Sequence, residues 1–222
     1  AGFRQALRLH LVEASPSLRA EQQRRLGAAD PVWIGDIGAL PDGPLLLVAN
    51  EFLDALPIRQ FVRGQAHWAE RLVAVDEDGG GLCFAAGPES PALTLLVPAE
   101  QRDAAPGAIV ELCPAAATVA AGLAARLRTQ PGAALFIDYG YGAPHLGSTL
   151  AAVGAHRAAG ILDAPGSADL SAHVDFAAFA AAAKAGGASV YGPVPDGAFL
   201  TALGAPLRLA ALLRRAAAGQ RD

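Results

Sequence analysis

The segment 45–49 is the feature that most constrains the fold of this chain. It has the sequence Leu-Leu-Leu-Val-Ala and lies between the turn signal Pro41-Asp42-Gly43-Pro44 and the polar pair Asn50-Glu51. A short continuous apolar run bounded by turn residues is typical of a strand covered on both faces, because a strand with one wet face alternates apolar and polar residues. The sequence therefore predicts a central strand of a parallel sheet here.

Strand-like and helix-like segments alternate on both sides of this run, as a parallel α/β sheet requires. The expected elements are a strand at 7–12, a helix at 18–26, a strand at 32–34, a helix at 115–128, a strand at 133–138, a helix at 176–185, a strand near 189–191 and a closing helix at 207–218. The pattern predicts an α/β core.

The stretch from Pro57 to about Pro98 interrupts this alternation with β-rich segments separated by glycine-rich turns, which are hairpin signals. The segments are 58–62, 67–75, 82–86 and 93–97. We therefore expect a first part of the core at 1–56, an antiparallel β-rich insertion at 57–106 and the remainder of the core at 107–222.

Composition restricts the class of protein. The 222 residues are 53% hydrophobic and 17% charged, which suits one domain with its own apolar core. The formal net charge of -4 argues against nucleic-acid binding. Short apolar runs, without a signal segment, predict a cytoplasmic protein with no membrane partner. The spacing of Cys83 and Cys113 indicates neither a disulfide nor a metal site.

Ligands of doubly wound sheets bind beyond the carboxyl ends of the strands, so polar residues after the expected strands are the candidates for a site. Glu13 follows the strand at 7–12. A carboxylate there can accept hydrogen bonds from two ribose hydroxyls. It can equally cap the helix that Ser15 or Ser17 opens, and the spacing leaves both interpretations open.

The segment from Asn50 to Pro57 places an amide and two carboxylates after the central strand. Glu51 and Asp54 are three residues apart, so one helical turn would bring them to the same face. Two close acids repel each other unless they share a proton or face a cation, and a guanidinium suits such a pair. The alternative is that Asn50 caps a short helix and Asp54 supports the turn.

Two later segments also carry polar groups. Asp138, Tyr139 and Tyr141 follow the strand at 133–138 in a glycine-rich loop, which can cover a ligand or form an ordinary turn. His173 lies two residues before Asp175, but the chain has no Gly-x-Ser-x-Gly elbow, which argues against a hydrolase. Taken alone, His173 is more often structural than catalytic. No Gly-x-Gly-x-x-Gly turn follows an early strand.

Segment 50–58, Asn-Glu-Phe-Leu-Asp-Ala-Leu-Pro-Ile, followed by Gln60-Phe61-Val62, resembles the signature of a methyltransferase family. The family depends on S-adenosyl-L-methionine, and its mitochondrial members are complex I assembly factors and protein arginine methyltransferases. Segments 9–15, 111–114, 137–141 and 169–176 agree in the same order. The resemblance implies a class I methyltransferase fold, a Rossmann-like parallel sheet with an inserted antiparallel β-rich subdomain for the substrate.

The resemblance also implies functional residues. Cofactor-binding roles fall to Glu13, Asp36, Ile37 and Asn50, and catalytic roles to Asn50, Glu51, Asp54 and His173. Glu13 would bind the ribose, Asp36-Ile37 would lie near the adenine, and the acids after the central strand would face the methyl acceptor.

The expected partner is a protein substrate, with a respiratory complex subunit as the candidate, and a homodimer is a further expectation. Eukaryotic relatives are expected in the mitochondrial matrix. Family members carry a first strand and a glycine loop upstream of the position of Ala1, and because the chain lacks methionine even at position 1, we expect its natural start to lie upstream. The alternative function is therefore a non-catalytic binding or assembly module.

Overall fold

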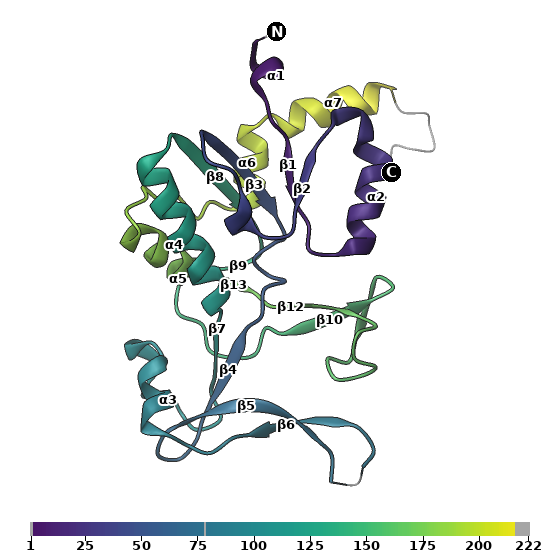
Figure 1. The fold of residues 1–222 in the computed structure, drawn as a ribbon. Helices are drawn as coiled ribbons and strands as arrows, with labels where there is room; N and C mark the ends of the chain where they lie inside the picture. Colours follow the sequence, from purple (N-terminus) through teal and green to yellow (C-terminus); the bar gives the residue numbers. More distant parts are fainter. Residues whose placement is uncertain (1, 78, 216–222) are drawn as a thin grey trace.

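Two pairs of parallel strands form the part of the molecule predicted by the strand and helix alternation. The structure, a computed structural model, describes residues 2–77 and 79–215 (Figure 1). β1 (His10–Val12) pairs with β2 (Val32–Ile34), and β3 (Leu45–Asn50) pairs along its full length with β8 (Gly132–Ile137). The predicted strands at 32–34, 45–49 and 133–138 are therefore confirmed.

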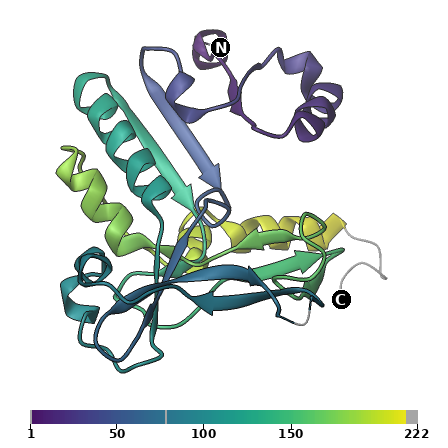
Figure 2. The ribbon, with the colours of Figure 1, turned by 60° about the horizontal axis from the view of Figure 1, so that its bottom comes forward.

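Helices cover one face of the β3–β8 pair. α4 (Pro114–Thr129) and α5 (Phe176–Ala185) lie on the same side of it (Figure 2), which confirms the helices expected at 115–128 and 176–185. Phe136 of β8 contacts Phe179 of α5 edge to face, with ring centroids 4.8 Å apart. This contact belongs to an apolar cluster that also contains Leu53.

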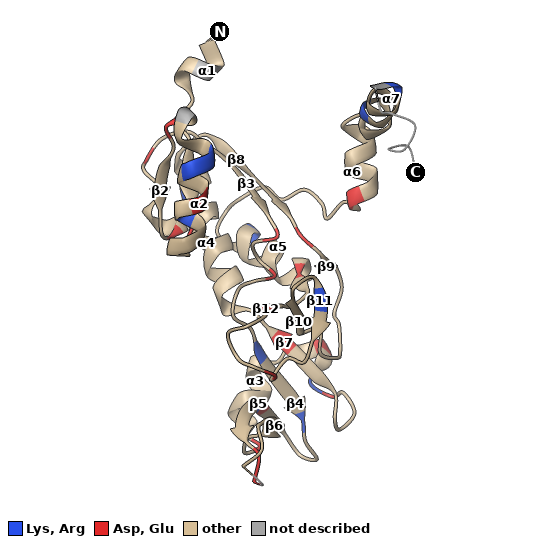
Figure 3. Cartoon of the chain, turned by 90° about the vertical axis from the view of Figure 1, so that its right-hand side faces the viewer, with Lys and Arg blue, Asp and Glu red and all other residues tan. Residues whose placement is uncertain are grey.

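The opposite face of the same strands is uncovered, contrary to the prediction of a strand buried on both sides. Leu46 and Val48 are 70% and 71% exposed, and Leu135, beside Val48 in the register, is 40% exposed. Successive side chains of a strand point to opposite faces, so covering one face leaves every second residue in solvent. No described element packs on this second face, and α6 (Asp196–Ala202) and α7 (Ala205–Arg215) stand apart from it (Figure 3).

The fold is mixed α/β, but the expected continuous Rossmann-like sheet is not present among the described strands. β1–β2 and β3–β8 are separate two-stranded sheets. A continuous sheet needs a ladder of backbone hydrogen bonds between neighbouring strands, and no described strand pairs with the edge of β3 opposite β8.

A four-stranded antiparallel sheet forms the β-rich region, with the strand order β6-β5-β4-β7. Its strands are β4 (Arg59–Arg63), β5 (Trp68–Val75), β6 (Leu82–Ala86) and β7 (Ile109–Leu112). Phe61, Trp68, Val97 and Val110 form its buried core. The hairpin signals correctly predicted three of these strands. The sheet continues through β7, while the division at 57–106 stays a prediction.

Four predicted elements differ from the structure. The strand expected at 93–97 is helix α3 (Pro91–Leu96), because the Ser90 side chain accepts a hydrogen bond from the Ala92 N–H and caps it. No strand forms near 189–191, where the following Pro193 and Pro195 lack N–H donors. The strand expected at 7–12 is shortened to β1 behind α1 (Gly2–Ala6). The closing helix is α7, and positions 216–218 of the prediction lie outside the described residues.

The remaining elements connect these parts. They are α2 (Pro16–Leu26), the parallel pair β9 (Gly140–Tyr141) and β13 (Val174–Asp175), the antiparallel strands β10 (Ala151–Gly154), β11 (Arg157–Ala159) and β12 (Asp169–Ser171), and short 3-10 turns at Gly27–Ala29, Ile37–Ala39 and Ala99–Gln101. Across residues 2–77 and 79–215, no single helix is both long and apolar enough to cross a membrane. The bent pair Asp196–Ala202 and Ala205–Arg214 meets that requirement only jointly, by length and composition.

Candidate functional site

A cavity of about 470 Å³ opens at the carboxyl ends of β3 and β8. Three segments and one side chain of α5 line it: Asn50 and Glu51, residues 137–142, residues 193–196 and Phe176. Three carboxylates, of Glu51, Asp138 and Asp196, and two tyrosines belong to this lining, which contains no lysine, arginine or histidine. The acidic and aromatic side chains of this lining suit a positively charged ligand.

Glu51 adopts a backbone conformation that is unusual for its residue type. Its φ angle is +47°, in the left-handed region, and its N–H donates to the Ile137 carbonyl oxygen over 2.9 Å. That conformation costs a non-glycine residue about 1–2 kcal/mol. Non-glycine residues held in this way cluster at functional sites. The side chain is exposed at the cavity.

Asp138 anchors the turn that follows β3. Its Oδ2 atom accepts the N–H groups of Phe52, Leu53 and Asp54 at 3.2, 2.9 and 3.2 Å, and its Oδ1 accepts the N–H of Tyr139 at 2.9 Å. Burial raises the pKa of Asp138 in spite of these donors. Its carboxylate oxygens thus serve the backbone and hold the two strand ends together.

Asp54 lies behind the cavity wall. The side chain is only 8% exposed, and its Oδ2 accepts a hydrogen bond from the Tyr139 hydroxyl. Its Oδ1 is buried and has no partner among the described residues. Because residues 51–56 form an irregular turn and no helix, buried Asp54 and exposed Glu51 do not share one face.

His173 lies beside Tyr139 and outside the cavity lining. Its ring packs edge to face on the Tyr139 ring, with centroids 5.5 Å apart, and its backbone N–H donates to Thr149 Oγ1 over 2.9 Å.

Gly140 is required between Tyr139 and Tyr141, since a Cβ at this position would come within 2.0 Å of the Val174 carbonyl oxygen. The glycine in the Asp-Tyr-Gly motif therefore serves this close backbone approach.

The residues expected to bind the cofactor are split between the β1–β2 pair and the β3–β8 pair. Asn50 lies at the cavity, whereas Glu13, Asp36 and Ile37 follow β1 and β2 and do not line it. Glu13 accepts the Ser15 N–H at 2.8 Å and Gln22 Nε2 at 3.0 Å. Asp36 accepts the Gly38 N–H at 2.7 Å and caps the turn that begins at Ile37.

Sequence reasoning missed two parts of the site. The wall at 193–196 comes from a segment far along the chain with no polar motif beyond Asp196. Tyr139 follows Asp138, but no sequence signal paired it with Asp54, 85 positions away.

The pKa values of both tyrosines in the cavity are raised. Burial is the main cause of the raised pKa of Tyr139, with the hydrogen bond to Asp54 second, and burial raises the pKa of Tyr141 to about 12.

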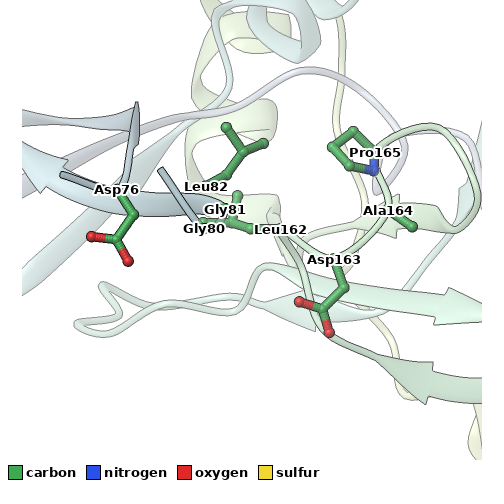
Figure 4. A pocket seen from close by; sticks show the side chains of 8 residues that line it. All are labelled: Asp76, Gly80, Gly81, Leu82, Leu162, Asp163, Ala164 and Pro165. Carbon is green, nitrogen blue, oxygen red and sulfur yellow. The ribbon is translucent and has the colours of Figure 1, made fainter. Parts of the chain in front are cut away.

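A second cavity, of about 630 Å³, lies between the β5–β6 hairpin and the loop 162–165. Figure 4 shows Asp76 and Asp163 on opposite sides of it, with glycine and apolar residues between them. It lies away from the strand ends. Throughout the described ranges, no group of three or more histidine, cysteine or acidic side chains is arranged to hold a metal ion.

In α/β proteins with parallel strands, ligands bind beyond the carboxyl ends of the strands, which is where this cavity lies. The chain belongs to the family described as putative S-adenosyl-L-methionine-dependent methyltransferases, whose profile matches residues 1–194. This match confirms the family resemblance expected from the sequence motifs, and S-adenosyl-L-methionine is the cofactor of that family.

Individual relatives agree with the family assignment. The chain is 35% identical over 233 residues to "Protein arginine methyltransferase NDUFAF7, mitochondrial" of Xenopus tropicalis, covering 93% of this chain and 52% of the relative. The homologue of Caenorhabditis elegans is 32% identical, with 93% and 53% covered. A crystal structure from Burkholderia thailandensis bound to S-adenosyl-homocysteine has 31% identity and a TM-score of 0.75, covering 92% of this chain and 55% of that one. The chain thus spans about half the length of these relatives.

The chemistry of Glu13 fits the ribose of this cofactor. One protein donor orients each carboxylate oxygen, and a carboxylate with about four acceptor positions keeps capacity for two further hydroxyls. The indole of Trp33 donates to Gln22 Oε1 over 2.9 Å, which steadies the residue that holds Glu13.

Proposed function

We propose that this chain is part of an S-adenosyl-L-methionine-dependent methyltransferase that methylates an arginine side chain of a protein. The observation that carries the proposal is the cavity at the ends of β3 and β8, whose lining combines three carboxylates and two tyrosines without a cationic residue. The names of the relatives, protein arginine methyltransferases, support the same acceptor.

Arginine stays protonated in proteins, so the site has to hold a guanidinium and direct one of its nitrogens. In the proposal, Glu51 and Asn50 accept guanidinium N–H groups at the cavity mouth. Charge-assisted hydrogen bonds of this kind are stronger than neutral ones and fix a planar group in orientation. Most of the rate enhancement then comes from alignment and from the exclusion of water.

The cofactor supplies an electrophilic methyl group when it is bound. Glu13 would hold the ribose, and Asp36 and Ile37 would lie at the adenine. Behind the cavity wall, Asp54 holds the Tyr139 hydroxyl and His173 packs against its ring, so both would keep that wall in place. The family resemblance alone supports a respiratory complex subunit as the acceptor protein, and the cytoplasmic location and the homodimer remain predictions.

A second candidate, a non-catalytic binding or assembly module, is favoured by one observation. Glu13 and Asp36 belong to the β1–β2 pair, which is a separate sheet from the one that carries Asn50 and Glu51. Calorimetry of the full-length protein with S-adenosyl-homocysteine separates the two candidates. Binding supports the enzyme, and no binding at millimolar ligand supports the module.

The activity test replaces Glu51 by glutamine, which keeps its size and removes its charge. Glu51→Gln should bind S-adenosyl-homocysteine within about twofold of the unmodified protein and lose roughly 100-fold in turnover of an arginine peptide, as removal of one transition-state contact does. Glu100→Gln, at an exposed site on the turn Ala99–Gln101, is the control. Equal turnover of Glu51→Gln and the control would refute the assignment.

A further inference from the structure

Tyr139 connects the cavity to a buried acid. The residue lies two positions after the end of β8, lines the cavity and is 41% exposed, while its hydroxyl donates to Oδ2 of Asp54. The phenolic proton therefore points toward Asp54 and away from the cavity. Beside the Ser171 side chain near it, the phenolic oxygen can accept a donor that enters the cavity, because a tyrosine hydroxyl can donate and accept at once.

Asp54 is held in place but its charge is incompletely matched. Its N–H donates to Asp138 Oδ2 at 3.2 Å, and its carbonyl oxygen accepts the Ala172 N–H at 3.0 Å, so the backbone cannot turn the side chain away. The carboxylate is more than nine-tenths buried, and its Oδ1 has no partner in the part of the chain that the structure describes. Burying a carboxylate with one donor is costly. Such a carboxylate gains from any further donor that reaches it.

The charged group next to Asp54 is also acidic. Asp138 accepts the Asp54 N–H at its Oδ2 and is itself a carboxylate, while Tyr139 donates to Asp54 and the His173 ring packs on the Tyr139 ring. No lysine or arginine is paired with Asp54 among the described residues. The negative charges of Asp54 and Asp138 therefore repel each other at this contact.

We propose that Tyr139 is a catalytic residue of the arginine site, with Asp54 as the final proton acceptor. This inference rests on the proposed function. The Tyr139 oxygen accepts an N–H of the acceptor guanidinium. As the new N–C bond forms and the carbon–sulfur bond of the sulfonium donor breaks, with its electron pair left on sulfur, the excess proton moves from that nitrogen to Tyr139. The phenolic proton moves to Asp54, which later releases it to solvent.

Tyr141 lines the same cavity but does not offer this path. Its hydroxyl has no carboxylate partner among the described hydrogen bonds, and its ring stacks on His145 with centroids 5.0 Å apart. A phenol without a buried acceptor can position a guest but has nowhere to pass a proton. The hydrogen bond to Asp54 thus distinguishes Tyr139 from Tyr141 as a path for a proton.

The test compares Tyr139→Phe with Tyr191→Phe, a tyrosine that is 92% exposed and outside the cavity lining. Tyr139→Phe should lower kcat for an arginine peptide at least tenfold, with unchanged affinity for S-adenosyl-homocysteine and the same near-ultraviolet circular dichroism. Tyr191→Phe should match the unmodified protein. Asp54→Asn added to Tyr139→Phe should cause no further loss of kcat, since both changes break one path.

A binding measurement separates failure of this inference from failure of the proposed function. N-acetyl-arginine amide is titrated into the unmodified protein and into Tyr139→Phe, and tenfold weaker binding to the variant supports the contact. Equal binding and equal kcat overturn the role of Tyr139 and leave the methyltransferase intact. Methyl transfer without any loss in Tyr139→Phe overturns it as well. If Asp54→Asn does not fold, the Tyr139→Phe results decide alone.

Discussion

Replacing Glu51 by glycine should stabilise this chain while it disables the site. The residue holds a φ angle of +47°, which costs an L-amino acid about 1–2 kcal/mol and costs glycine almost nothing. Its side chain is exposed and forms no hydrogen bond or ion pair within the described residues. The substitution therefore removes strain and loses little contact energy.

The expected gain is smaller than the strain because glycine also loosens the unfolded chain. A glycine costs about 0.4–1 kcal/mol relative to alanine through the entropy of the unfolded state. The net stabilisation is then about 0.5–1 kcal/mol. For a chain of this size, 1 kcal/mol changes Tm by about 2–4 °C, so Glu51→Gly should raise Tm by roughly 1–4 °C.

Asp30→Gly is the matched control. Asp30 is also acidic and exposed, and its φ angle of +46° is within one degree of that of Glu51, but it lies outside the cavity lining. Thermal unfolding followed by circular dichroism should show a rise in Tm for both variants, whereas only Glu51→Gly should lose methyl transfer. A lower Tm for Glu51→Gly beside a higher Tm for Asp30→Gly would show that the Glu51 side chain supports the fold, which refutes the reasoning.

Two further predictions concern one partly buried and one buried carboxylate, those of Asp138 and Glu111. Burial raises the pKa of Asp138, so the contribution of this group to the free energy of unfolding is full below its usual pKa of 3.8 and declines as the pH rises through the folded pKa. Urea unfolding from about pH 3 to pH 6 should therefore show a narrowing difference in the free energy of unfolding between the unmodified protein and Asp138→Asn. A difference that widens with pH would contradict this. Glu111 is buried and accepts Gln60 Nε2 at 2.6 Å and the Thr149 N–H at 3.0 Å, besides the Thr149 hydroxyl. Glu111→Ala should therefore cost about 3 kcal/mol or more in urea unfolding and Glu111→Gln clearly less, since the amide oxygen still accepts; equal losses would disprove this account.

Local sequence signals were sufficient where one pattern dominates. The apolar run at 45–49 and the helical patterns at 115–128 and 176–185 correspond to β3, α4 and α5. The segment 93–97 was ambiguous because a run of six or fewer apolar residues fits a strand or a helical turn equally well. The Ser90 cap and Pro91 decided it, and they lie just outside the apolar run.

The prediction that β3 is covered on both faces shows a different limit. An apolar sequence indicates that burial would be favourable, but it does not say which element does the covering. α4 and α5 occupy one face, and Leu46 and Val48 remain exposed on the other. The alternation of strand and helix patterns likewise indicated an α/β chain but not that its described parallel strands form three separate pairs.

By itself, the sequence determined which polar residues follow which strands, because chain order and strand periodicity are local properties. Asn50 and Glu51 could therefore be expected at the end of β3. Only the tertiary structure decided that Tyr139 donates to Asp54, that Asp138 binds the turn after β3 and that residues 193–196 close the cavity. These contacts join segments far apart in the chain, so they depend on how the strand ends and helices pack and have no counterpart in any local pattern.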